Sequence, residues 1–200
     1  MPKFKVNVEY DGGSYVGWQK QNNGPSIQES LEHALESFSG IKTEVIGAGR
    51  TDSGVHALSM AAHFELDSEQ FSIETIKKAM NYHLGKQPIT VLEVMPIDQS
   101  FHARFSAISR TYEYRVSRTK NPFSVNSYFL LRDLDFQSMK KACKFLHGSH
   151  DYTSFAKLHS ENYTNNCEVY IANWKEDENL LIFTIMMSQT TLFIFKWLKG

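Results

Sequence analysis

The amino-acid sequence predicts an α+β fold of two ferredoxin-like halves, each following the βαββαβ order with a mostly antiparallel sheet. Three observations favour this fold class. Short segments alternate apolar and polar residues, longer segments between them repeat apolar residues at helical spacing, and the order β-α-β-β occurs twice along the 200 residues. We therefore expect one α/β domain at residues 1–105 and a second at residues 106–200, the second half being incomplete.

The first strand and the first helix have the clearest patterns. Apolar and polar side chains alternate over residues 4–10, which is typical of a strand covered on one face. The SIQE motif at residues 26–29 has the spacing of a capping box, and the apolar residues that follow it fall on one helical face. The sequence therefore predicts a helix over residues 26–39.

Four further elements complete the first half. TEVIGAG (residues 43–49) and ALSMAAHFEL (residues 57–66) have the composition of strands. Ser72 is placed as the N-cap of a helix that reaches Leu84, and ITVLEVMPI (residues 89–97) reads as another strand. The predicted order of the first half is β-α-β-β-α-β.

The second half begins in the same order. Residues 108–116 alternate as a strand, with Arg110 on its apolar face, and Asp135 caps a helix that extends to Leu146. Two strands, NCEVYIANW and NLLIFTIMM, are expected on either side of a charged turn, KEDE, at residues 175–178. A last helix and strand are then missing, because only SQTTLFIFKWLKG follows Met187.

Composition and charge narrow the classes of function. The formal net charge is −1, so any nucleic-acid footprint must be local, and the candidate is the basic stretch at residues 102–120. Two cysteines without a CxxC pair favour buried free thiols in a reducing compartment, and no apolar run is long enough to span a membrane. We therefore expect a cytoplasmic protein.

The glycine-rich stretch GAGRTDSGVHA at residues 47–57 is the main candidate for chemistry. It does not match the dinucleotide fingerprint or the P-loop, and the histidines and serines lack the spacings of zinc or serine-hydrolase motifs. Arg50 lies two residues from Asp52, where its guanidinium can keep the carboxylate ionised and oriented. Such a carboxylate suits nucleophilic or electrostatic catalysis, although DSG is also an ordinary turn sequence.

Three motifs together resemble the TruA family of tRNA pseudouridine synthases. They are GRTDSGVHAL (residues 49–58), FHARFSA (residues 101–107) and RTYEYRV (residues 110–116). YDGGSYVGWQKQ, SIQESLE and HDYTSFAK support the resemblance, in the family's order, over about nine-tenths of the chain.

The resemblance implies an enzyme that isomerises uridine to pseudouridine at positions 38, 39 and 40 of the tRNA anticodon stem-loop. Asp52 would be the catalytic nucleophile, Tyr112 would contact the target base, and Arg50 would help to position the flipped nucleotide. Arg104 and Arg110 would bind RNA phosphates. The family implies tRNA as the partner and a homodimer. The reaction requires no metal or other cofactor, and no membrane association is expected because no apolar run is long enough to span a membrane.

Several alternatives stay open at this point. Tyr112 has the register of an ordinary buried strand tyrosine, and Arg104 and Arg110 can be surface charges. The chain could be an inactive RNA-binding homologue, or an unrelated ferredoxin-like interaction domain in which Asp52 is a turn residue. Family members continue into a helix that carries an active-site arginine, whereas MMSQTTLFIFKWLKG has none. We therefore expect a C-terminal truncation or frameshift near Met187.

Overall fold

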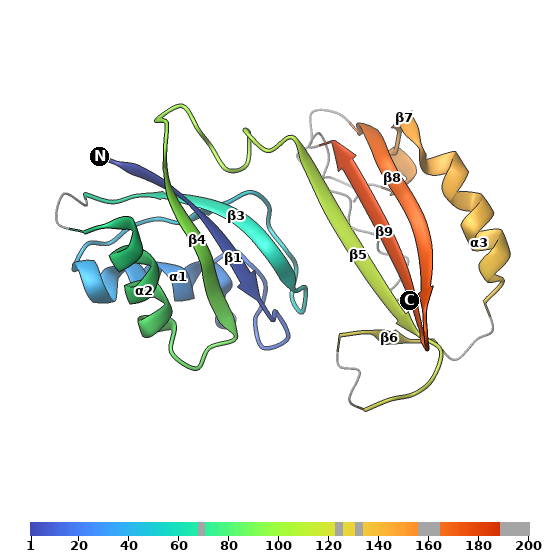
Figure 1. Cartoon of the computed structure of the whole chain (residues 1–200), viewed down its shortest axis with the longest axis horizontal. Helices are drawn as coiled ribbons and strands as arrows, with labels where there is room; N and C mark the ends of the chain where they lie inside the picture. The colour runs from blue at the N-terminus through green and yellow to red at the C-terminus, as the bar shows by residue number, and fades with distance from the viewer. Residues whose placement is uncertain (68–70, 123–125, 131–133, 156–164, 189–200) are drawn as a thin grey trace. The chain divides into compact units, whose positions relative to one another are not determined.

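The chain divides into two compact units, Met1–Ala107 and Ile108–Gly200. The computed structural model describes residues 1–67, 71–122, 126–130, 134–155 and 165–188. Each unit has its own sheet (Figure 1). Each also has its own apolar core. The predicted α+β class with mostly antiparallel sheets is confirmed.

The first unit has the predicted order β-α-β-β-α-β. Its elements are β1 (Lys3–Tyr10), α1 (Ile27–Ser39), β2 (Ile46–Gly47), β3 (Ala57–Glu65), α2 (Ile73–Leu84) and β4 (Ile89–Ile97). The sheet order is β2-β3-β1-β4, and every neighbouring pair is antiparallel. This is the strand order of a ferredoxin-like unit, in which both helices pack on one face of the sheet.

Strand and helix patterns in this unit follow the sequence closely. Phe4, Val6, Val8 and Tyr10 of β1 are buried, and they alternate with residues that are more exposed. Ser26 is the N-cap of α1, and its hydroxyl accepts a hydrogen bond of 3.2 Å from the backbone N–H of Glu29. The apolar faces of α1 and α2 close one core with the buried side of β1, β3 and β4.

The opposite face of this sheet carries polar residues and a returning segment of the chain. Lys3 and Lys5 of β1 lie directly across from Glu65 and His63 of β3, so these four side chains share the face that the helices leave open. The segment at residues 98–106, which follows β4, returns to this face. Lys3 Nζ donates to backbone carbonyl oxygens in it at 2.8 and 3.2 Å.

The second unit is built on three long antiparallel strands. Its elements are β5 (Ser109–Ser117), β6 (Tyr128–Phe129), α3 (Phe136–Ala142), a 3₁₀ turn (Cys143–Leu146), β7 (Gly148–Asp151), a second 3₁₀ turn (Thr153–Phe155), β8 (Asn166–Asp177) and β9 (Leu180–Ser188). The sheet order is β6-β5-β9-β8-β7, with β5 and β6 parallel and the other pairs antiparallel.

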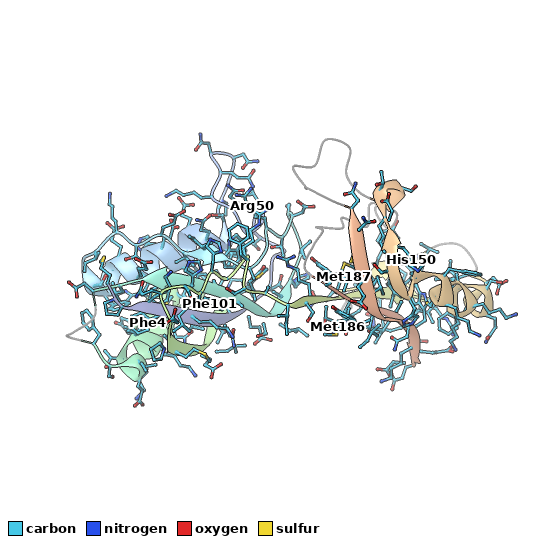
Figure 2. The ribbon with its side chains drawn as sticks, turned by 90° about the horizontal axis from the view of Figure 1, so that it is seen from above. Phe4, Arg50, Phe101, His150, Met186 and Met187 are labelled. Atoms are coloured by element: carbon cyan, nitrogen blue, oxygen red, sulfur yellow. The ribbon has the colours of Figure 1, made fainter. Side chains whose placement is uncertain are left out.

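One face of this sheet forms the core of the second unit. Buried and partly exposed residues alternate along the whole of β9. Met186 and Met187, which are consecutive in β9, therefore point to opposite sides of the sheet, and Met187 is the buried one (Figure 2). Cys143 from the 3₁₀ turn packs on the same core as Met187.

Two predicted boundaries in the first and second units were wrong. The strand expected over residues 43–49 is paired only at Ile46–Gly47. The helix expected to reach Leu146 ends as an α-helix at Ala142 and continues as a 3₁₀ turn. A 3₁₀ turn has three residues per turn, so Cys143 and Leu146 fall on the same side, and both pack against the core.

The charged turn predicted at residues 175–178 was also misplaced. Lys175, Glu176 and Asp177 are the last residues of β8 and pair with β9, so the turn consists of Glu178 and Asn179, with Glu178 at a φ of 48°. Charged residues are tolerated at exposed strand ends as well as in turns, so the composition alone did not distinguish the end of β8 from a turn. The short strands β6 and β7 were not predicted, and Ile108, expected in a strand, lies before β5 and is 86% exposed.

The expectations for the C-terminal segment lie outside the described residues, which end at Ser188. Most of the HDYTSFAK motif is described, up to Phe155. None of the described helices is long and apolar enough to cross a membrane.

Candidate active site

Asp52 lies in the loop that joins β2 to β3, at residues 48–56. Its side chain is exposed. Arg50 in the same loop, which Figure 2 labels, is exposed as well. The carboxylate is therefore presented to solvent and is not packed into the core. A solvent-facing carboxylate on a structured loop is accessible to a large substrate.

The segment that follows β1 pairs with this loop through the backbone. The N–H of Trp18 donates to the carbonyl oxygen of Thr51 at 3.0 Å, and Gly17 and Asp52 form an isolated antiparallel bridge. The hydroxyl of Ser53 donates to the carbonyl oxygen of Tyr15 at 3.1 Å. Asp52 is thus held by contacts of the residues on both sides of it.

Side chains add a second set of contacts between the same segments. The hydroxyls of Tyr10 and Thr51 share a hydrogen bond of 2.9 Å. Burial raises the pKa of Tyr10 to about 12, and the bond to Thr51 opposes this shift. Tyr10 is therefore a neutral hydrogen-bonding group at physiological pH.

His56 and Gly12 meet at the far end of the loop. His56 Nδ1 lies 3.2 Å from the N–H of Gly12 and 3.0 Å from a carboxylate oxygen of Asp11. This nitrogen accepts from Gly12 when it is unprotonated and donates to Asp11 when it carries a proton, so it serves one partner at a time. A Cβ added to Gly12 would lie 2.1 Å from the carbonyl oxygen of Val55, so only glycine fits this close approach.

Arg50 forms no ion pair with Asp52 in the described part of the chain, and both side chains face solvent. The orientation of Asp52 in the structure comes from the backbone contacts of the loop. The interaction of Arg50 with Asp52 or with a substrate stays a prediction.

Arg104 belongs to the segment at residues 98–106 of the first unit. Ala103 is buried, whereas Arg104 and Phe105 are exposed, and the guanidinium carbon of Arg104 lies 5.8 Å from the centre of the Phe105 ring. The turn therefore presents a positive charge beside an exposed aromatic ring.

Arg110 and Tyr112 lie two residues apart on β5 of the second unit, so they share one face of that strand. Tyr112 is partly buried against the core of the unit. Desolvation raises its pKa, and the charge of Arg110 opposes the shift. Tyr112 thus packs against the core of the second unit, as the sequence pattern allowed, and the residue as a whole is partly exposed.

The residues that support the Asp52 loop were not predicted from the sequence. Four of them, Tyr10, Gly12, Tyr15 and Trp18, lie in the motif YDGGSYVGWQKQ. The sequence feature that could have located them is a pair of glycine-containing turns among aromatic residues, directly after a strand. Because the aromatic residues are buried, this pattern indicates that two stretches of backbone pack closely.

Comparison with known proteins identifies the family. Residues 6–106 match the model of the tRNA pseudouridine synthase family. The chain is similar to tRNA pseudouridine synthase A of Bacteroides fragilis (44% identity over 185 residues, 92% of this chain and 73% of the relative) and of Parabacteroides distasonis (39% over 186 residues, with the same coverage). It is also similar to the protein of that name from Maricaulis maris (44% over 158 residues, 78% of this chain) and spans 63% of that relative's length. The chain therefore belongs to the tRNA pseudouridine synthase family.

Proposed function

We propose that this protein isomerises uridine to pseudouridine at positions 38, 39 and 40 of the tRNA anticodon stem-loop, with Asp52 as the nucleophile. The observation that carries the proposal is an exposed carboxylate on a tightly supported loop, inside the region that matches the family. The three relatives are named tRNA pseudouridine synthase A, which supports tRNA as the substrate.

The reaction conserves every atom of the nucleoside except for one proton exchange. The bond from ribose C1′ to N1 of uracil breaks, a bond from C1′ to C5 forms, C5 loses its proton to solvent, and N1 ends with a proton. Asp52 can assist by attack at C6, by attack at C1′ or by promoting elimination from the sugar. In each route an ionised carboxylate must reach the nucleoside, which suits its exposed position.

The target uridine must leave its stack before the carboxylate can reach it. Extrusion of a base costs a few kcal/mol, about what one or two stacking and phosphate contacts return. Tyr112 is the proposed contact for the base, Arg50 helps to position the flipped nucleotide, and Arg104 and Arg110 bind phosphates. The exposure of Arg104 and the partial exposure of the residue Tyr112 support these roles.

The proposal extends to the state of the protein in the cell. A homodimer in the cytoplasm is what the family resemblance implies, and two buried free thiols, Cys143 and Cys167, suit a reducing compartment. Light scattering of the purified chain measures its oligomeric state directly.

Release of tritium from tRNA labelled at C5 of uridine tests the proposal, because isomerisation expels that hydrogen. We expect release by the unmodified chain and a loss of roughly 10⁴-fold or more in Asp52→Ala, the scale on which loss of a nucleophile lowers kcat. Asp67→Ala, a change at another exposed aspartate of the first unit, is the matched control and should keep full activity. Release that survives Asp52→Ala contradicts the role of Asp52, and tRNA binding without release favours an inactive RNA-binding homologue.

A further inference from the structure

His63 is a buried titratable residue for which the proposed chemistry has no use. It lies on β3, on the sheet face that the helices leave open, and is only 4% exposed. The segment at residues 98–106 covers it, with the ring of Phe101 at 6.1 Å and the ring of His102 at 4.9 Å between centres. Figure 2 labels Phe101 in this segment.

One hydrogen bond ties His63 to this segment. The backbone N–H of Ala103 donates to His63 Nδ1 at 3.1 Å, and the contact is buried. Since the N–H must be the donor, Nδ1 carries no proton, and the neutral ring holds its proton on Nε2. Ala103 immediately precedes Arg104, so the bond fixes the backbone from which the arginine projects.

Lys3 anchors the other side of the same segment. Its ammonium group donates to the carbonyl oxygens of Gln99 and Phe101 and forms an ion pair of 3.3 Å with Glu65. Two neighbouring groups of the sheet thus hold the segment, Lys3 as a donor and His63 as an acceptor. Beyond these anchors the side chains of Arg104 and Phe105 are free to face solvent.

We propose that His63 is the positioning residue that holds the segment at residues 98–106 so that Arg104 contacts the tRNA backbone. The inference rests on the proposed function, because it deepens the role given there to Arg104. His63 itself does not contact RNA and acts through the amide of Ala103. A protonated ring has no acceptor at Nδ1 and would leave the buried N–H of Ala103 without its partner.

The charges around His63 favour its neutral form. Lys3 and Lys5 face it from β1, Glu65 lies on its own strand, and His102 faces it from the turn. Burial lowers the pKa of His63, the charges of His102 and Lys3 lower it further, and Glu65 opposes them. The contact is therefore complete above the ordinary histidine pKa of 6.5 and is lost as the pH falls through the lower value of the folded state.

Two variants distinguish the effect of losing the hydrogen-bond acceptor at His63 from the effect of losing the volume of its ring. His63→Leu removes the acceptor, whereas His63→Asn keeps one, because Asn Oδ1 is attached to Cγ like His Nδ1. We expect His63→Leu to weaken tRNA binding and to reduce the slope of log Kd against log salt by about 1, as Arg104→Ala does. The double variant His63→Leu/Arg104→Ala should have a Kd for tRNA within about twofold of that of Arg104→Ala, because both changes remove the same contact with the RNA backbone. His33→Leu on α1 is the matched control.

Hydrogen exchange without RNA tests the contact separately from the proposed function. The amide of Ala103 should exchange slowly in the unmodified protein and in His63→Asn, and at least about tenfold faster in His63→Leu. Protection and tRNA affinity should both stay constant near pH 6.5 and fall as the pH drops through the lower, folded-state pKa of His63 in the unmodified protein, but not in His63→Asn. The His63→Asn result and this pH series remain informative even if His63→Leu folds poorly.

Three results would overturn the inference. They are unchanged exchange at Ala103 in His63→Leu, tRNA binding that this variant does not alter, and additive losses in the double variant. A protein that protects Ala103 but binds no tRNA contradicts the proposed function itself and removes the role of His63 in RNA binding with it.

Discussion

Substitution of Gly12 tests whether the segment after β1 positions the catalytic loop. A Cβ at this residue would lie 2.1 Å from the carbonyl oxygen of Val55 and 2.7 Å from its carbonyl carbon, whereas ordinary contacts begin at 3.4 Å. Both atoms are backbone, so no side chain can rotate away. In Gly12→Ala, the loop must therefore move by more than about 1 Å relative to β1.

Such a movement has separate effects on stability and on catalysis. Overpacking of this kind typically costs about 1–3 kcal/mol, which leaves a stable unit largely folded. A displacement of about 1 Å in a catalytic group lowers kcat by about 100-fold. We therefore expect Gly12→Ala to remain folded, to bind tRNA and to lose about two orders of magnitude in the rate of tritium release.

Gly40→Ala is the matched control for a glycine substitution in the same unit. Gly40 ends α1 at a φ of 72°, and nothing lies within 4 Å of an added Cβ. The left-handed backbone costs about 1–2 kcal/mol for a residue with a Cβ, without any contact to the Asp52 loop. Urea denaturation of both variants should give comparable losses of stability, while only Gly12→Ala loses kcat. A folded Gly12→Ala protein with unchanged kcat refutes the argument that close backbone packing sets the loop.

Two further predictions concern the N-cap of α1 in the first unit and the buried thiols of the second unit. Ser26→Ala removes the hydroxyl that caps α1, so urea denaturation should show a loss of about 1 kcal/mol with kcat unchanged, and an unaltered midpoint would contradict the capping role. Cys143 and Cys167 are buried, and burial raises the pKa of both thiols, so iodoacetamide should label them slowly in the native protein and rapidly in urea, as followed by mass spectrometry. Fast labelling of the native protein would show that the core of the second unit opens readily.

Elements whose apolar residues repeat with a clear period were predictable, because the repeat follows from the burial of one face of a strand or helix. β1 and α1 each bury one face against the same core, and the capping box marks the start of α1 without reference to the rest of the chain. Where the composition fits two structures, the prediction failed. Charged residues at 175–177 extend β8 because β9 supplies partners for their backbone groups.

Asp52 and its neighbour Arg50 could be named as candidates from the sequence, because the motif around them is short and contiguous. The contacts that hold Asp52 could not be predicted, since the hydrogen bond between the hydroxyls of Tyr10 and Thr51 joins residues 41 positions apart and forms only when the strand order brings them together. The bond from Ala103 to His63 likewise spans 40 positions.

The sequence by itself thus determined the order of the elements in the first unit, the fold class and the residue types available for chemistry, since each follows from interactions between near neighbours in the chain. Only the tertiary structure decided which part of the backbone supports the Asp52 loop and which side chain holds the segment at residues 98–106, which carries Arg104. The physical reason is that these contacts depend on strand register, and register is set by the packing of the whole unit.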